Sequence, residues 1–165
     1  MDTKVIEYVQ LHCHNRITDF IFPQISRIGN AGAVWLIYAA VWILEGKSRR
    51  FVYILIFSLA LSHLTGQLLK LLVGRPRPFA AEHDSSLLIK APGGYSFPSG
   101  HSSSSFAAAT VFFLVNSPLC AAAIILACLI AFSRIFLNVH YPSDTLAGSL
   151  LGVLCAILVS SAYGL

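Results

Sequence analysis

The sequence predicts an all-α fold, an integral-membrane helical bundle of about five transmembrane helices preceded by an N-terminal interfacial amphipathic helix. Hydrophobic residues make up 56% of the 165 residues, charged residues only 11%, and the mean hydropathy is +0.75. A soluble domain carries about 25% charged residues, so this chain has too few to cover a water-facing surface. The apolar residues fall into runs separated by short polar turns, and the length allows one domain, 1–165.

The first 29 residues mix charged and apolar side chains. This pattern predicts one or two amphipathic helices in the membrane interface, broken near Asn15 and kinked at Pro23. The stretch 1–15 is too polar for a signal peptide. The apolar residues that recur at helical intervals are Val5, Ile6, Val9, Ile17, Phe20, Ile21, Ile25 and Ile28.

Five apolar runs follow and predict five helical spans. The second has 23 residues, roughly 34 Å of helix, and ends at Gly74 before Pro76. The last begins at Pro142, a residue that suits the first turn of a helix. A loop over 74–101 separates the second span from the third, with a short interfacial helix around 86–89. The expected spans are 28–44, 51–73, 102–115, 119–138 and 142–163.

Consecutive spans alternate in direction, so the ends of the second and fourth and the starts of the third and fifth share one face. The opposite face carries Lys47, Arg49 and Arg50 in a short turn, and the positive-inside rule makes that face cytoplasmic. We therefore predict a multi-pass protein of the cell membrane whose 74–101 loop is extracytoplasmic. Basic residues held by a site are poor markers of topology, and four lie on the other face: Lys70, Arg75, Arg77 and Arg134.

The net charge of +4 and the pI near 9.0 indicate an anionic partner. Basic residues cluster at the ends of apolar runs, which argues against nucleic acid and favours an anionic lipid head group. The four cysteines are predicted to be free thiols, because three of them lie inside apolar runs at no metal-binding spacing. They are Cys13, Cys120, Cys128 and Cys155.

The stretch 97–105 lies where the polar loop becomes an apolar run. Ser99 or Ser102 can cap the helix that follows, and Gly100 lets a ligand approach the backbone closely. The free N–H groups at the start of a helix form an anion site. His101 beside that site can protonate a leaving oxygen or activate water. The alternative is an ordinary loop-to-helix turn.

Three cationic side chains, Lys70, Arg77 and Arg134, are expected near the same point and suit the oxygens of a phosphate. Each alone could simply extend to lipid head groups. Their convergence with Ser99 and His101 on one membrane face favours a site. Lys70 also shares a helix face with His63 and Gln67, and that face must point into the bundle.

His140 and Asp144 form a second informative pair. A carboxylate four residues after a histidine at a helix start can hold one ring nitrogen and leave the other free to attack. The alternative is a structural His–Asp pair. A phosphoryl transfer needs a nucleophile and a proton donor on opposite sides of phosphorus, and His140 with His101 would supply both.

These clusters resemble the three motifs of the type 2 phosphatidic acid phosphatase family. Lys70 followed by Arg77-Pro78, then 98–101 (Pro-Ser-Gly-His), then Ser133-Arg134 with His140 and Asp144 match in order. The family spacing selects Arg77 of the doubled Arg-Pro and leaves Arg75 as an additional phosphate-binding candidate.

The resemblance implies a membrane lipid phosphatase that works without metal or another cofactor. His140 would attack phosphorus and form a phosphohistidine, Asp144 would orient it, and His101 would protonate the leaving oxygen. The carboxylates nearest to a metal site, Glu82 and Asp84, match no motif. The groups implied to hold the phosphate are Lys70, Arg77, Ser99, Gly100 and Arg134.

Small size, short loops and an outward-facing site resemble bacterial members that dephosphorylate undecaprenyl pyrophosphate. Phosphatidylglycerophosphate or phosphatidic acid is the second substrate candidate, followed by lipid A phosphates. Two other classes of protein fit the sequence less well. Vanadium haloperoxidases share the pocket but are soluble and much larger, and a non-catalytic lipid-binding protein would not need every motif residue intact.

Overall fold

The computed structural model describes residues 2–46, 48–81 and 87–164, and these residues form helices and connecting loops without strands. The helices are α1 (Asp2–His12), α2 (Arg16–Ile28), a 3-10 turn η1 (Asn30–Gly32), α3 (Ala33–Leu44), α4 (Arg49–Val73), α5 (Pro78–Ala81), α6 (Gly100–Leu114), α7 (Cys120–Phe136) and α8 (Pro142–Ala162). The all-α prediction is confirmed.

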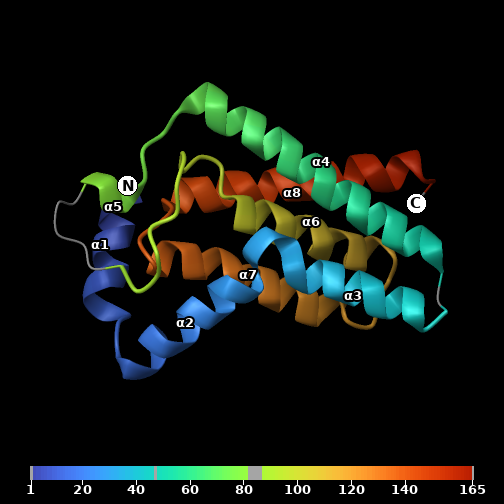
Figure 1. Ribbon diagram of the computed structural model, residues 1–165, viewed down its shortest axis with the longest axis horizontal. Helices are drawn as coiled ribbons and strands as arrows, with labels where there is room; N and C mark the ends of the chain where they lie inside the picture. The colour runs from blue at the N-terminus through green and yellow to red at the C-terminus, as the bar shows by residue number, and fades with distance from the viewer. Residues whose placement is uncertain (1, 47, 82–86, 165) are drawn as a thin grey trace.

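Helix α6 occupies the middle of the bundle, packed by α4, α7 and α8 (Figure 1). Its first turns are rich in serine, and the buried hydroxyls of Ser102, Ser103 and Ser105 lie inside protein rather than against lipid. A short helix with polar residues is tolerated at membrane depth because neighbouring helices cover it. The protein core therefore surrounds the helix that begins at Gly100.

The expected spans correspond to helices, with one difference in the first. Two segments, Arg49–Ala80 and Pro142–Ala162, are long and apolar enough to cross a membrane alone, and α7 is a shorter apolar helix. The first span is not a straight helix over 28–44. Helices α2 and α3 meet at a bend of 54° and pass the same test only as a pair. Gly29 and Gly32 lie at that bend, where propensity for a continuous helix is low.

The N-terminal segment folds as two helices separated at Asn15, as expected. The Asn15 side chain accepts from the N–H groups of Ile17 and Thr18 and so caps α2. Pro23 lies within α2, which continues to Ile28. Large apolar side chains such as Ile17 and Phe20 are about 70% exposed (69% and 71%), which suits a helix lying in the membrane interface.

The loop from 74 to 99 differs in detail from the expectation. Its helix is α5, at Pro78–Ala81, and residues 87–89 are not helical; Ser86, the expected start of an interfacial helix, lies outside the described residues. Gly74 ends α4 with φ of 61°, a left-handed conformation that favours glycine. The loop returns over the same end of the bundle as α1 (Figure 1).

Small residues set the contact between α6 and α8. A Cβ on Gly148 would lie 2.4 Å from the carbonyl oxygen of Ser99, and one on Gly152 would lie 2.2 Å from that of Ser103. Close approach of backbones through small residues is the usual way in which helices associate in membranes. Since α6 carries His101 and α8 carries Asp144, this contact fixes the two motif helices against each other.

We predict that Gly152→Ala destabilises the protein by about 1–3 kcal/mol, because its methyl group would overlap the Ser103 carbonyl. Thermal unfolding in detergent should begin at a lower temperature. Gly66→Ala on α4 is the matched control, since its Cβ would meet only Leu151 at 3.8 Å. Equal stability of the two variants would contradict the role of the α6–α8 contact.

Candidate active site

The ends of α4 and α7 and the starts of α6 and α8 all lie toward the end of the bundle at which α1 is found, and they bring the predicted clusters together (Figure 1). A cavity of about 690 Å³ lies there between α4 and α6. Its polar wall contains Lys70, Arg77, Arg134, His101 and His140, and Gly100 lines it as well. Ser99 and Asp144 do not line this cavity.

His140 follows α7 and lies just before Pro142, the first residue of α8. Its Nε2 lies 3.3 Å from an Nη of Arg77, and its Nδ1 lies 3.6 Å from Oδ2 of Asp144. Arginine only donates, so Nε2 accepts and the proton of a neutral ring is on Nδ1, facing the carboxylate. The imidazole is 2% exposed. Its second nitrogen therefore offers a lone pair on the cavity side.

The protonation state of His140 follows from its surroundings. Burial lowers its pKa to about 4; the nearby Asp144 carboxylate opposes the shift, while the charges of Arg134, Arg77 and Lys70 add to it. At neutral pH the ring is uncharged and needs no deprotonation before it can act as a nucleophile.

Asp144 is fully buried at the third position of α8. Its Oδ1 accepts from Arg75 at 2.7 Å, and its Oδ2 accepts from the N–H of Tyr141 at 2.9 Å. The second contact is one half of a capping box, in which a side chain three residues into the helix binds the N-cap N–H. Local helix-start geometry thus aims the carboxylate back at His140.

The two arginines of the doubled Arg-Pro have different partners. Arg77 is 7% exposed and reaches the cavity, where it donates to the carbonyls of Gly93, Gly94 and Val139 at 2.9–3.0 Å. Arg75 lies outside the cavity wall, with its guanidinium stacked 3.9 Å from the Tyr141 ring centroid and bonded to Asp144. The sequence alone left this choice open.

The other two cations also face the cavity. Lys70 donates to the carbonyl of Tyr95 at 2.9 Å. Arg134 is 3% exposed; one Nη donates to the Ser26 hydroxyl, and its Nε has no hydrogen-bond partner among the described residues. A buried guanidinium with a free donor beside a cavity is suited to an anionic ligand.

The backbone at the start of α6 has the geometry expected of an anion site, but the Ser99 side chain does not take part in it. A Cβ on Gly100 would meet nothing within 4 Å, so a ligand has room against the backbone there. The Ser99 hydroxyl is fully buried and accepts from the N–H of Ser102 at 3.4 Å and from its hydroxyl at 3.0 Å. Ser99 thus caps the helix, and its side chain does not reach the cavity.

His101 projects from the first turn of α6 into the cavity, and its Nε2 lies 2.9 Å from Oδ1 of Asn30. Sequence reasoning did not single out Asn30. The only signal was its place in a polar break between two apolar helices. The neighbouring Gly29 also packs closely on His101, since a Cβ there would lie 3.2 Å from the His101 ring.

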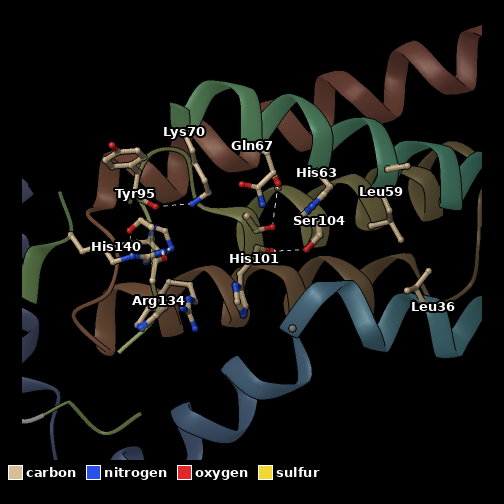
Figure 2. Close-up of a pocket in the computed structure, with 18 of the residues that line it drawn as sticks. Leu36, Leu59, His63, Gln67, Lys70, Tyr95, His101, Ser104, Arg134 and His140 are labelled. Atoms are coloured by element: carbon tan, nitrogen blue, oxygen red, sulfur yellow. Dashed lines mark hydrogen bonds between the residues drawn. The ribbon is translucent and has the colours of Figure 1, made fainter. Parts of the chain in front are cut away.

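Away from these charges the cavity becomes apolar. Figure 2 shows Lys70, Gln67, His63 and Leu59 in succession along α4, with His101 and Arg134 across from them and Leu36 at the far end. The prediction that His63 and Gln67 share the face of Lys70 is confirmed. The cavity thus changes from cationic to polar to apolar along α4.

Among the described residues, no group of three or more His, Cys, Asp or Glu side chains could hold a metal ion. Glu82 and Asp84, the carboxylates nearest to a metal site in the sequence, lie outside the described residues. The four cysteines are free thiols.

Known proteins are similar to this chain in sequence and in fold. Residues 51–164 match the model of the PAP2 superfamily. The chain is 32% identical over 151 residues to an undecaprenyl-diphosphatase of Sulfolobus acidocaldarius, covering 90% of this chain and 70% of the relative. It is 34% identical to a decaprenylphosphoryl-5-phosphoribose phosphatase of Mycobacterium tuberculosis, covering 85% and 77%. The crystal structure of Aquifex aeolicus LpxE superimposes with a TM-score of 0.85 at 26% identity, covering 97% and 94%.

Proposed function

The chain belongs to the PAP2 superfamily and is a multi-pass membrane lipid phosphatase, and we propose that it hydrolyses undecaprenyl diphosphate to undecaprenyl phosphate through a phosphohistidine. The observation that carries the proposal is a single cavity with His140 and three cationic side chains at one end and an apolar wall at the other. Such a cavity fits a lipid whose phosphate is polar and whose tail is not.

In the first step, Arg77 gives up its hydrogen bond to Nε2 of His140 and binds a phosphate oxygen, and the freed lone pair on Nε2 attacks the terminal phosphorus. The bond from that phosphorus to the bridging oxygen breaks, and His101, which enters the step as an imidazolium, donates a proton to the oxygen that leaves with the lipid. The imidazolium formed at His140 is stabilised by the Asp144 carboxylate, whose Oδ2 is now 3.6 Å from Nδ1. When the imidazolium forms, we expect the distance between Nδ1 and Oδ2 to shorten to that of a hydrogen bond.

In the second step, His101 accepts a proton from water as the water attacks the phosphohistidine. The P–N bond breaks, phosphate leaves, and both histidines return to their starting states. Lys70, Arg77, Arg134 and the N–H of Gly100 are proposed to bind the oxygens on which charge builds. Ser99 would contribute by capping the helix that presents Gly100.

The cationic groups and helix N–H donors supply the charge stabilisation that a metal gives in other phosphatases. Lys70 and Arg77 donate to backbone carbonyls of residues 93–95 at 2.9–3.0 Å. A phosphate would replace neutral carbonyls by charged oxygens, and a charge-assisted bond is about twice as strong. These cations would thus exchange their partners when substrate binds.

The polar part of the cavity, at Gln67 and His63, favours a diphosphate over a phosphate monoester. Gln67 lies one helical turn from Lys70, roughly 4.5 Å along the axis, and His63 lies roughly 10 Å away. Both side chains face the cavity, and apolar Leu59 follows directly. A prenyl diphosphate has the same order: reacting phosphate, second phosphate, hydrocarbon. Phosphatidylglycerophosphate and phosphatidic acid are the second candidate, since their ester carbonyl groups could also contact Gln67 and His63.

We expect His140→Ala to lower kcat by a factor of about 10³ or more, because the nucleophile is lost. His101→Ala should lose about 10²–10⁴-fold, and least with leaving groups that need no proton. Both are measured as phosphate release by purified protein that elutes from size exclusion like the wild type. Release by His140→Ala at a tenth of the normal rate would exclude His140 as the nucleophile.

The substrate is tested with a panel of prenyl diphosphate, prenyl phosphate, phosphatidylglycerophosphate and phosphatidic acid in detergent with excess chelator. The prenyl diphosphate should give the highest kcat/KM, and His63→Leu with Gln67→Leu should lower that value about tenfold while changing the phosphatidic acid value less. Leu68→Ala, on the lipid-facing side of α4, is the control. A preference for either glycerolipid would favour the second candidate, and activity restored only by magnesium would overturn the metal-free mechanism.

The proposed site is extracytoplasmic, because the basic turn near Arg49 and Arg50 assigns the other face to the cytoplasm. In a variant without native cysteines, Lys90→Cys should react with an impermeant thiol reagent on intact cells. Ser48→Cys should react only after the cells are opened, and both residues are exposed in the structure. The opposite labelling pattern would invert the topology and count against a substrate presented at the outer leaflet.

A further inference from the structure

The carboxylate of Asp2, at the start of α1, contacts two residues of the site region. Its Oδ1 accepts from the N–H of Ser143 at 3.2 Å, and its Oδ2 accepts from the Ser143 hydroxyl at 2.5 Å. The same Oδ2 pairs with Nη2 of Arg75 at 2.9 Å. Ser143 is the second residue of α8, so Asp2 binds a helix N–H that has no partner within the helix.

Arg75 links this carboxylate to the buried one. Its other Nη donates to Oδ1 of Asp144 at 2.7 Å and to the Ser143 hydroxyl at 2.7 Å. One guanidinium therefore bridges two carboxylates that lie 73 and 69 residues away from it in sequence. Tyr141 supports the guanidinium from one side, at 3.9 Å from the ring centroid. The continuous set of contacts is Asp2, Arg75, Asp144 and His140.

Helix α1 is held in the position that this set requires. Val9 is 5% exposed and packs with Phe136, Leu137 and Val139, the residues that lead to His140. Gln10 donates from Nε2 to the carbonyl of Phe136 at 3.0 Å. The helix that carries Asp2 thus docks on the same segment that carries the nucleophilic histidine.

We propose that Asp2 is a positioning residue for the reaction, acting through Arg75 and Ser143 on Asp144; this rests on the proposed role of His140. If Asp2 were absent, Asp144 would be the only anionic partner of Arg75. Arg75 would then neutralise the carboxylate that must stabilise the His140 imidazolium. Asp2 divides the charge of Arg75 between two carboxylates and leaves Asp144 more negative. It also fixes the first turn of α8, from which Asp144 projects.

The charge of Asp2 suits this role at neutral pH. Its partial burial raises its pKa, but the bonds from Ser143 and then from Arg75 outweigh burial and hold the pKa below its ordinary value. Asp2 is therefore ionised wherever the phosphatase is assayed near neutrality. An anion at the N-terminus of α8 is also favourable for the helix dipole.

The first test is Asp2→Asn, which keeps the shape of the side chain and removes its charge. We expect kcat to fall about tenfold with KM within twofold, since a small misplacement of a reacting group is costly. Asp2→Glu should recover part of the loss. Glu7→Gln, which removes an exposed carboxylate from the same helix, is the matched control and should leave kcat unchanged. An unchanged kcat in Asp2→Asn, or a KM increase without a kcat loss, would overturn the proposal.

The second test separates positioning from mere support of α1. If Asp2 acts through Arg75, then Asp2→Asn should have little further effect on kcat in an Arg75→Ala background, because the link is already broken. Effects that multiply would overturn the proposal, as would a loss of kcat that thermal unfolding fully explains. Failure of the proposed function is recognised separately, because His140→Ala would then retain phosphate release.

Discussion

The buried carboxylate of Asp144 is the group on which the rest of the site depends. It has no exposed surface, yet the Arg75 guanidinium and the Tyr141 N–H lie within 2.9 Å of its oxygens, and the His140 ring lies 3.6 Å away. An ionised carboxylate in such a position costs several kcal/mol unless donors surround it. Arg75 comes from the α4–α5 loop, whereas His140 and Tyr141 both come from the connection before α8, so the charge draws these two segments together.

Packing of α6 against α8 sets the second half of the site. The close approach at Gly148 brings the Ser99 carbonyl against α8, and the Ser99 N–H donates to the Asp144 carbonyl at 3.0 Å. The helix that presents Gly100 and His101 is therefore registered directly on the helix that presents Asp144. A shift of one helix relative to the other would change the distance between the proposed acid and the proposed nucleophile. Stability and catalytic geometry depend on the same contact.

The high cost of placing a charge in hydrocarbon explains where the charged and the apolar side chains of the bundle lie. Lys70, Arg77 and Arg134 would be costly against hydrocarbon, and all three line a cavity at the bundle end. Exposed leucines of α4, such as Leu64 and Leu68 at 66% and 58%, lie on other faces of the same helix. The apolar part of the cavity near Leu36 and Leu59 gives a lipid tail a path from this end into the bundle. Undecaprenyl diphosphate is the substrate that we propose for it.

The sequence by itself determined the helical class, the positions of the long helices after 48 and most of the residues that meet at the cavity, because hydrophobic periodicity and motif spacing are local signals. It did not decide the bend between α2 and α3, the capping role of Ser99, or the division of labour between Arg75 and Arg77. Two arginines two residues apart look equivalent in a sequence. Only packing shows that one faces the cavity and the other is bonded to Asp144 and Asp2. Asp2 is 142 residues from Asp144, and no local pattern reports a contact that depends on how α1 docks on the finished bundle.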